Sequence, residues 1–263
     1  MNSENWLSVA VGILIPLLGT TLGAACVFFL KNSISDRLSR ALSGFAGGIM
    51  VSASFFSLIL PALEMTNDLG KLSFIPVGTG FFVGMLFLLV LDLLVPHTHL
   101  DKSEEGPKSG LKRTTKLFLA VTIHNLPEGM VVGVLFAGWL YGKSSITLAS
   151  ATVLAVGIAL QNFPEGAVVS MPMRAEGMPK GKTFLFGMLS GVIEPVGALM
   201  TVFAASLFLP IIPYLLAFAA GAMFYVVVEE LVPEMAKGEH NNTGTVCFAL
   251  GFIIMMALDI AFG

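Results

Sequence analysis

The chain of 263 residues is 56% hydrophobic and only 12% charged, whereas about a quarter of the residues in an average soluble domain are charged. A chain of this length with so few charges cannot cover a soluble surface, which excludes an ordinary soluble protein. The formal net charge of −3 decides little, but the positions of the positive charges along the chain are informative. The partner that we expect is a lipid bilayer, and we expect no nucleic-acid partner.

Eight apolar runs are long enough to span a bilayer, which takes about 20 residues in a helix. Short polar connectors separate the runs, and no segment is large enough for a second domain. We therefore predict an all-α integral membrane protein in which residues 1–263 form a single polytopic domain. The predicted transmembrane helices cover residues 6–30, 40–62, 74–96, 115–138, 145–170, 182–208, 211–232 and 244–262.

Lysine and arginine are unevenly distributed among the connectors, and the loops richest in them normally face the cytoplasm. The connectors after the first, third, fifth and seventh runs hold twelve of the 14 such residues. These are Lys31, Arg37, Arg40, Lys102, Lys108, Lys112, Arg113, Lys116, Arg174, Lys180, Lys182 and Lys237, and the other two are Lys71 and Lys143. We expect the first group in the cytoplasm, both termini on the extracytoplasmic side, and a multi-pass protein of the cell membrane.

Two related polar segments interrupt the fourth and fifth runs. H-N-L-P-E-G begins at His124, and Q-N-F-P-E-G begins 37 residues later at Gln161. Over ten positions the two segments share six residues, which indicates related halves that face each other. A proline inside a helix removes one backbone donor and disturbs the carbonyl four residues earlier, so we expect bends at Pro127 and Pro164.

The polar side chains of each segment share one helix face. Residues three or four positions apart are neighbours on a helix. In each segment, polar residues lie three and four positions before the glutamate. Each stripe therefore offers an imidazole or amide, a second amide and a carboxylate: His124, Asn125 and Glu128 on one helix, and Gln161, Asn162 and Glu165 on the other. That combination is a metal-ligand set within a membrane.

Internal symmetry extends beyond this pair. Residues 218–223 in the seventh run (F-A-A-G-A-M) resemble residues 45–50 in the second (F-A-G-G-I-M). Because these two runs cross in opposite senses, the likeness predicts an inverted repeat, which is common in secondary transporters. It fits a three–two–three arrangement of helices with the motif pair in the centre. The sixth run adds Glu194-Pro195 at mid-depth.

Carboxylates inside a membrane need a compensating charge. Each costs about 2.5–3.5 kcal/mol at the centre of a spanning helix, so Glu128, Glu165 and Glu194 together would cost on the order of 8–10 kcal/mol. No lysine or arginine lies at mid-membrane beside them. Protons could neutralise three acids but would not explain the matching His124 and asparagines, whereas a divalent cation explains the whole set. Oxygen ligands with one imidazole suit Zn²⁺, Fe²⁺, Mn²⁺ or Cd²⁺, and a two-metal centre bridged by carboxylates is feasible.

Two further groups of polar residues leave alternatives open. The loop over residues 97–114 begins with His97 and His99 and continues with acids, so it could collect or release a divalent cation or be an ordinary solvated loop. Glu229 and Glu230 lie near the cytoplasmic end of the seventh run, where an exit-path role and plain solvation are both open. Asp259 lies near the outer end of the eighth run, where we expect it close to water.

The motif pair resembles the paired signatures of the ZIP family of zinc- and iron-type divalent-metal transporters, and the chain is similar to bacterial-type members. The likeness extends over nearly the whole chain, through the eight runs, the histidine-containing loop and the segment S-G-V-I-E-P-V-G-A around Glu194. The resemblance implies metal uptake toward the cytoplasm, frequent homodimers, no cofactor besides the transported ion, and no enzymatic activity.

The resemblance also implies a binuclear site on the fourth, fifth and sixth helices. Two departures from the family pattern concern its surroundings: many members have histidine where this chain has Ser57 and Glu229, and some have an acid at the position of Asn162. The asparagine lowers the charge of the second metal position. The implied ligands are His124, Asn125, Glu128, Gln161, Asn162, Glu165 and Glu194.

The leading hypothesis is therefore a divalent-metal importer, most simply for Zn²⁺, in which one helix bundle moves against the other. A cation channel or an ion-coupled carrier of an organic solute is the alternative, although an anionic solute would call for a lysine or arginine in the bundle. An intramembrane metalloenzyme needs two histidines at a spacing such as H-E-x-x-H, and the chain has no such pattern.

Overall fold

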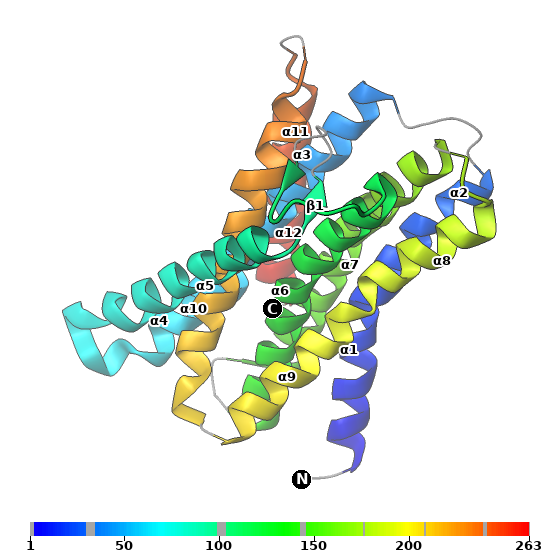
Figure 1. The fold of residues 1–263 in the computed structure, drawn as a ribbon. Coiled ribbons are helices and arrows are strands. Elements are labelled where there is room, and N and C mark those ends of the chain that lie inside the picture. The colour runs from blue at the N-terminus through cyan, green and yellow to red at the C-terminus, as the bar shows by residue number, and fades with distance from the viewer. Residues whose placement is uncertain are drawn as a thin grey trace.

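The computed structural model of the chain describes residues 3–29, 35–98, 104–142, 146–175, 177–207, 209–238 and 241–262. Eight of its helical segments are long and apolar enough to cross a membrane, which confirms the predicted number of spans. In Figure 1, α6 and α7 lie in the centre, with α1, α8 and α9 along one side and α5 and α10 on the other.

Four of the spans are single helices, and the other four are built from consecutive segments. The single helices are α5 (Phe74–Leu94), α6 (Arg113–Leu140), α7 (Leu148–Ala175) and α12 (Thr243–Phe262). The segmented spans are α1 (Ser3–Ala24) with α2 (Cys26–Phe29); α3 (Asp36–Ala53), η1 (Ser54–Ile59) and α4 (Leu60–Met65); α8 (Lys180–Gly191) with α9 (Ile193–Leu207); and α10 (Ile212–Val226), η4 (Val227–Leu231) and α11 (Val232–Ala236). Short 3₁₀ segments, η2 (Asn67–Leu72) and η3 (Leu209–Ile211), lie in connectors.

The helices extend beyond several of the predicted runs, because a helix continues into polar residues that hydropathy does not mark. The second span begins at Asp36, where the Ser35 hydroxyl accepts a hydrogen bond from the Leu38 amide over 3.3 Å. The fifth continues to Ala175. Three predicted run ends, residues 30, 145 and 208, lie outside the described residues.

The prolines of the motif pair do not end their helices. Both α6 and α7 continue through Pro127 and Pro164. The third Pro-Glu position differs, because the sixth span is divided there: α8 ends at Gly191 and α9 begins at Ile193, which places Glu194 in the first turn of α9.

The loop over residues 97–114 contains the two β-strands found among the described residues. Strands β1 (His97–Thr98) and β2 (Glu104–Glu105) pair antiparallel, with His97 opposite Glu105. His99 and Asp101 lie outside the described residues. The short ladder anchors the start of the loop beside α6.

Packing divides the helices into two sets. In the first, α1 packs on α7 and α8, and α6 packs on α9. In the second, α3 packs on α12, and α5 packs on α10. The two sets meet where α3 contacts α7 and α10 contacts α6. The two sets are in extensive contact along the centre of the molecule (Figure 1).

The segments around η1 and η4 occupy matching places in the two halves. Both are π-helical, and each begins nine residues after the phenylalanine of its F-A-x-G-x-M sequence, Phe45 or Phe218. A proline lies at the second position of the helix that follows each of them, α4 and α11. Single π turns within helices occur mostly at functional sites.

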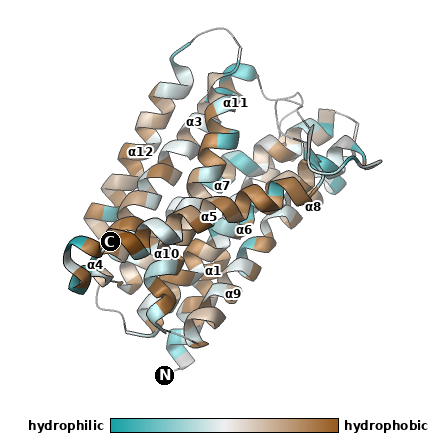
Figure 2. Cartoon of the chain, turned by 60° about the vertical axis from the view of Figure 1, so that its left-hand side comes forward, coloured by the Kyte–Doolittle hydropathy of each residue, from teal (hydrophilic) through white to brown (hydrophobic). Residues whose placement is uncertain are grey.

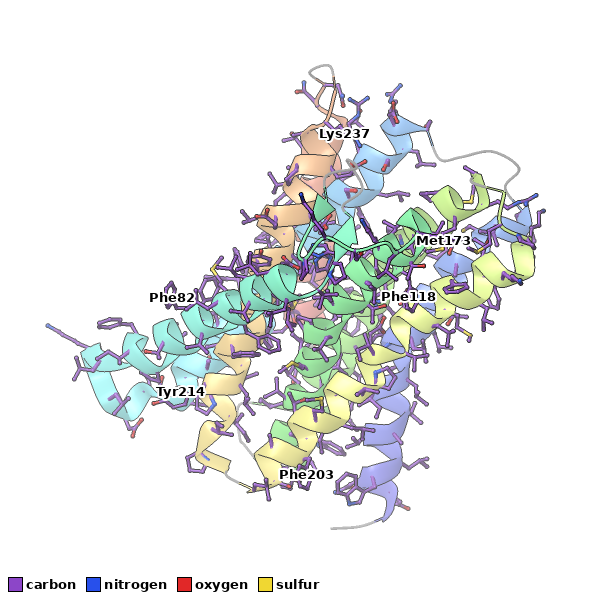
Figure 3. All side chains as sticks on the ribbon, in the orientation of Figure 1. Phe82, Phe118, Met173, Phe203, Tyr214 and Lys237 are labelled. Carbon is purple, nitrogen blue, oxygen red and sulfur yellow. The ribbon has the colours of Figure 1, made fainter. Side chains whose placement is uncertain are left out.

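The outer surface is apolar over the length of the spans. Figure 2 shows hydrophobic residues along α5, α10 and α12 and hydrophilic ones gathered toward the ends of the bundle. Phe82, Phe203 and Tyr214 point away from the bundle (Figure 3) and are 62%, 65% and 45% exposed. A soluble surface would not present such side chains together, whereas lipid tails favour them.

A prediction concerns the close approach of α5 and α10. A Cβ atom added at Gly84 would collide with the backbone carbonyl of Phe218, whereas at Gly78, on the same helix, no heavy atom of the described residues lies within 4 Å of it. Overpacking of this kind typically costs about 1–3 kcal/mol. Gly84→Ala should therefore lower the thermal unfolding temperature of the purified protein in detergent. Gly78→Ala is the matched control, and equal melting temperatures for the two variants would contradict the packing described.

Candidate functional site

The motif residues converge where α6, α7 and α9 meet. The side chains of Asn125, Glu128, Gln161, Asn162 and Glu194 are completely buried, at 0% exposure each. His124 is 6% exposed, and Glu165 is half-buried. The structure thus brings all seven predicted residues into one region, although they come from positions up to 70 apart in the chain.

The helices approach closely because of a glycine in the first motif. A Cβ atom at Gly129 would collide with the backbone of Glu194. Only glycine lets α6 and α9 come this near, and the approach places Asn125 within reach of the Glu194 carboxylate. The Asn125 Nδ2 donates to Glu194 Oε1 over 3.1 Å and to the Ser190 carbonyl over 3.2 Å.

Amide donors also connect α6 and α7. Gln161 Nε2 donates to Glu128 Oε1 over 2.8 Å. The side chain of Asn162 lies beside the carboxylates of both Glu128 and Glu194. The amides of the second motif therefore face the glutamate of the first, as the shared stripe of polar residues predicts.

The three carboxylates lie near one another. Glu128 has both Glu165 and Glu194 as neighbours, and any two of these groups repel each other when both are ionised. The sequence places no lysine or arginine in α6 after Lys116, in α7 before Arg174, or anywhere in α9. Like charges gathered in a buried place without a cationic side chain need another source of positive charge.

Several buried oxygen atoms around this point accept no hydrogen bond of ordinary geometry from any described residue. They are Glu128 Oε2, Glu165 Oε1, Glu194 Oε2, Asn125 Oδ1, Gln161 Oε1 and Asn162 Oδ1. Buried acceptors almost always have a donor in native proteins. Six such oxygens around one group of carboxylates form a surface that a cation would satisfy.

The described residues do not contain a group of three or more His, Cys, Asp or Glu side chains already drawn together as metal ligands. Three of the seven predicted ligands are asparagine or glutamine, and these residue types do not count toward a group of His, Cys, Asp and Glu. The binuclear centre implied by the family resemblance stays a prediction.

A second group of acids and histidines continues from His124 toward the lysine- and arginine-rich loops. His124 Nε2 lies 3.8 Å from Asp92 Oδ1, and His124 Nδ1 lies 3.9 Å from Glu230 Oε1. His97 Nε2 lies 3.6 Å from the same Asp92 oxygen, and both of these side chains are completely buried. Asp92 lies near the end of the third apolar run, before Pro96 and His97. No local sequence pattern predicts its contact with His124.

The residues considered for an exit path are in different surroundings. Glu230 is 9% exposed, whereas Glu229, its neighbour in η4, is exposed to the surroundings of the bundle. His97 is buried beside Asp92, and His99 lies outside the described residues. The part played by each of these residues stays a prediction.

A narrow cavity of about 50 Å³ borders the site, roughly the room of a few water molecules. His124, Glu165, Glu230 and Ser43 contribute its polar lining, and the rest of its wall is apolar. Its lining residues lie in α3, α6, α7, the end of α10 and η4, in the halves of these spans nearest the lysine- and arginine-rich loops.

A separate pocket of about 180 Å³ lies toward the opposite ends of the helices, where Ile146 precedes α7 and Ser150 lies in its first turn. In it, Ser57 Oγ lies 2.7 and 2.9 Å from the two carboxylate oxygens of Asp259. Asp259 therefore accepts a hydrogen bond from a serine of η1. Its side chain is also partly exposed, in agreement with its expected position near the outer end of the eighth run.

The sequence matches the family model described as ZIP zinc transporter over residues 101–259. It is 35% identical to the zinc transporter ZIP11 of Homo sapiens, over 93% of this chain and 94% of that protein. It is 36% identical to the zinc transporter GufA of Myxococcus xanthus, over 94% of this chain and 96% of that one. It is 39% identical to the zinc transporter ZIPB of Bordetella bronchiseptica, over 100% of this chain and 85% of that protein.

The chain belongs to the ZIP zinc transporter family. Family membership confirms the resemblance seen in the motif pair and the expectation of a multi-pass membrane transporter rather than an enzyme. The matched residues of this ZIP protein include all seven candidate ligands. Asp92 and His97 lie before the matched region, so their place beside His124 comes from the three-dimensional arrangement alone.

A prediction follows from the place of Asn162 between two carboxylates. Asn162→Asp would add a fourth acid to the buried group, so the metal-free protein should become less stable and the gain in stability on adding Zn²⁺ should become larger. Thermal unfolding in detergent, with chelator and with excess Zn²⁺, measures both changes. Asn67→Asp, which makes the same chemical change at an exposed position, should alter neither value. A metal-free Asn162→Asp protein as stable as the original would contradict the arrangement.

Proposed function

We propose that this ZIP family member carries Zn²⁺ across the cell membrane, with the buried group on α6, α7 and α9 as its transport site. The single observation that supports this most directly is the set of buried carboxylate and amide oxygens without hydrogen-bond donors among the described residues. A divalent cation supplies the positive charge that no lysine or arginine in these helices provides.

The ligand types suit an ion that must both bind and leave. Carboxylates, amide oxygens and one imidazole form a donor set for Zn²⁺ and neighbouring divalent ions such as Fe²⁺, Mn²⁺ and Cd²⁺. Thiolates, which hold structural zinc tightly, are absent from the candidate set. The two free cysteines, Cys26 and Cys247, are only partly buried and lie in α2 and α12.

We further propose two adjacent ion positions. Asn125, Asn162 and Glu194 surround one corner of the site, and His124 with Glu165 borders the cavity on the other side. Glu128 lies between the two corners, held by Gln161. A carboxylate in that position can bridge two ions, which would share the charge of the three glutamates.

The cavity suggests the direction of release. It borders Glu165 and His124 on the side of the lysine- and arginine-rich loops, which by the rule of positive charge face the cytoplasm. Both termini would then lie on the extracytoplasmic side. Glu230, Asp92 and His97 form a succession of acids and imidazoles along this route, and we propose that the ion passes along them on its way in.

The two sets of helices support an alternating-access mechanism. The seven candidate ligands all lie on the set formed by α1, α6, α7, α8 and α9. The flanking residues at the two mouths, Ser57 and Asp259 on one side and Glu230 and Asp92 on the other, lie on the second set. A displacement of the first set against the second would carry the ion from one mouth to the other.

The matching positions of η1 and η4 support the inverted repeat that we propose for this second set. Counted from Phe45 and from Phe218, Ser57 and Glu230 occupy equivalent positions in the two repeats. Each of these residues lies in a π-helical segment and borders a different one of the two pockets. Such a relation is what an inverted repeat about the membrane plane produces, and it fits the three–two–three arrangement.

The transport site is tested by removing its acids. Glu128→Ala and Glu165→Ala should abolish Zn²⁺ uptake into proteoliposomes, because each removes a carboxylate that no other group replaces. Glu64→Ala, at an exposed position of α4, should transport normally.

Metal content of the purified full-length protein, measured in parallel, separates a metal transporter from a carrier of organic solutes. The original chain should bind Zn²⁺ stoichiometrically and the two site variants should bind less. Undiminished uptake by both site variants would remove the assignment.

The proposed release route gives a separate prediction about rate. Glu230→Gln removes the charge that faces His124 from η4, so release should slow while equilibrium binding at the site changes little. Uptake at saturating Zn²⁺ should fall several-fold. Glu229→Gln makes the same change one residue earlier, at an exposed position, and should transport like the original. Equal uptake by the two variants would argue against a route past Glu230.

A further inference from the structure

Helix α1 contributes a side chain to the site that the motif pair does not reveal. Thr20 is completely buried, and its hydroxyl donates a hydrogen bond to Glu194 Oε1 over 2.7 Å. The two residues are 174 positions apart in the sequence. A threonine in an apolar run ordinarily bonds its own helix, as the adjacent Thr21 does by donating to the Leu17 carbonyl over 2.7 Å.

The packing around Thr20 requires two glycines. A Cβ atom at Gly166 of α7 would collide with the Thr20 carbonyl, and one at Gly191 of α8 would lie 2.9 Å from the Thr20 Cβ. The same added atom at Gly191 would lie 3.0 Å from Glu194 Oε1. Helix α1 therefore comes near enough to reach the carboxylate only because both neighbours lack a side chain at these points.

The hydrogen bonds on Glu194 are unequally divided between its oxygens. Oε1 accepts from Thr20 and also from Asn125. Oε2 is buried and accepts no hydrogen bond of ordinary geometry from any described residue, although the Asn162 side chain lies beside this carboxylate. Two donors on one oxygen fix the orientation of the carboxylate, so that the other oxygen is available to an ion.

We propose that Thr20 is a positioning residue of the transport site: its hydroxyl holds Glu194 so that Oε2 faces the ion. This inference rests on the proposed function. Groups that orient a ligand without touching the metal typically contribute about 10- to 100-fold to metal affinity or activity. Thr20 also attaches α1 to the ligand-bearing helices, which makes α1 part of the site.

The test compares Zn²⁺ binding by the full-length protein in detergent micelles, measured by titration calorimetry, with Zn²⁺ uptake in proteoliposomes. Thr20→Val replaces the hydroxyl by a methyl group of similar shape, and we expect Zn²⁺ affinity to fall roughly tenfold, with a matching rise in KM. Thr20→Ser retains the hydroxyl and should bind Zn²⁺ nearly as well as the original chain. Thr21→Val, one residue later, removes a hydroxyl that bonds only its own helix and should leave both values unchanged.

Two measurements distinguish positioning from packing. The metal-free unfolding temperature reports packing, so Thr20→Val and Thr21→Val should differ in Zn²⁺ affinity far more than in this temperature. In a Glu194→Gln background, Thr20→Val should have little additional effect on Zn²⁺ affinity, because the group through which it acts has changed. If Thr20→Val does not fold, Thr20→Ala, with less bulk, takes its place in both comparisons.

The outcomes separate this inference from the proposed function. Equal Zn²⁺ affinities for Thr20→Val and Thr21→Val, or an undiminished effect of Thr20→Val in the Glu194→Gln background, would overturn the role of Thr20. If Glu194→Ala still binds and transports Zn²⁺ like the original chain, the transport site itself is misplaced. Loss of binding in Glu194→Ala with normal binding in Thr20→Val would refute the inference about Thr20 alone.

Discussion

The mutual repulsion of Glu128, Glu165 and Glu194 is the constraint on which the rest of the structure depends. These side chains are gathered where no lysine or arginine of α6, α7 or α9 can reach them. Their neighbours are amides, which can offer either a donor or an acceptor. Gln161 and Asn125 each donate to one oxygen of a glutamate, and their own carbonyl oxygens meet no donor of ordinary geometry among the described residues. Hydrogen bonds thus offset part of the charge of the arrangement, and in the proposed function a cation supplies the rest.

The division of the helices into two sets gives this group of acids a definite place in the molecule. All of the candidate ligands belong to one set, so in the proposed mechanism their relative positions would be kept while the set as a whole moves. The residues at the two mouths belong to the other set and would remain still. A site that moves as one piece does not have to be dismantled to release its ion, which suits ligands whose geometry depends on several fixed hydrogen bonds.

Much of this organisation could be predicted from the amino-acid sequence. Hydropathy located all eight spans, because the lipid imposes apolar residues on every helix that crosses it. The spacing of His124 and Glu128, repeated at Gln161 and Glu165, predicted the stripes of candidate ligands, because positions three and four apart share a helix face whatever else the chain does.

The contacts between distant helices could not be predicted in this way. Nothing near Thr20 indicates that its hydroxyl reaches Glu194, and nothing near Asp92 indicates that it faces His124. These pairings depend on which helices are neighbours. The contact of Thr20 with Glu194 also depends on glycines in adjacent helices that let α1 approach. The difference between Glu229 and Glu230 was also hidden, since both are acids in the same short segment and only the fold buries one of them.

The π-helical segments have a consequence for how the two mouths are shaped. A π turn accommodates one residue more than an α turn, and one residue corresponds to about 100° of rotation around a helix axis. Everything beyond η1 and η4 is therefore turned relative to the face that α3 and α10 bury against their partners. The helical wheel of the buried half does not carry over to α4 and α11. The outer ends of these two spans can face in directions of their own while the interior of the bundle keeps its packing.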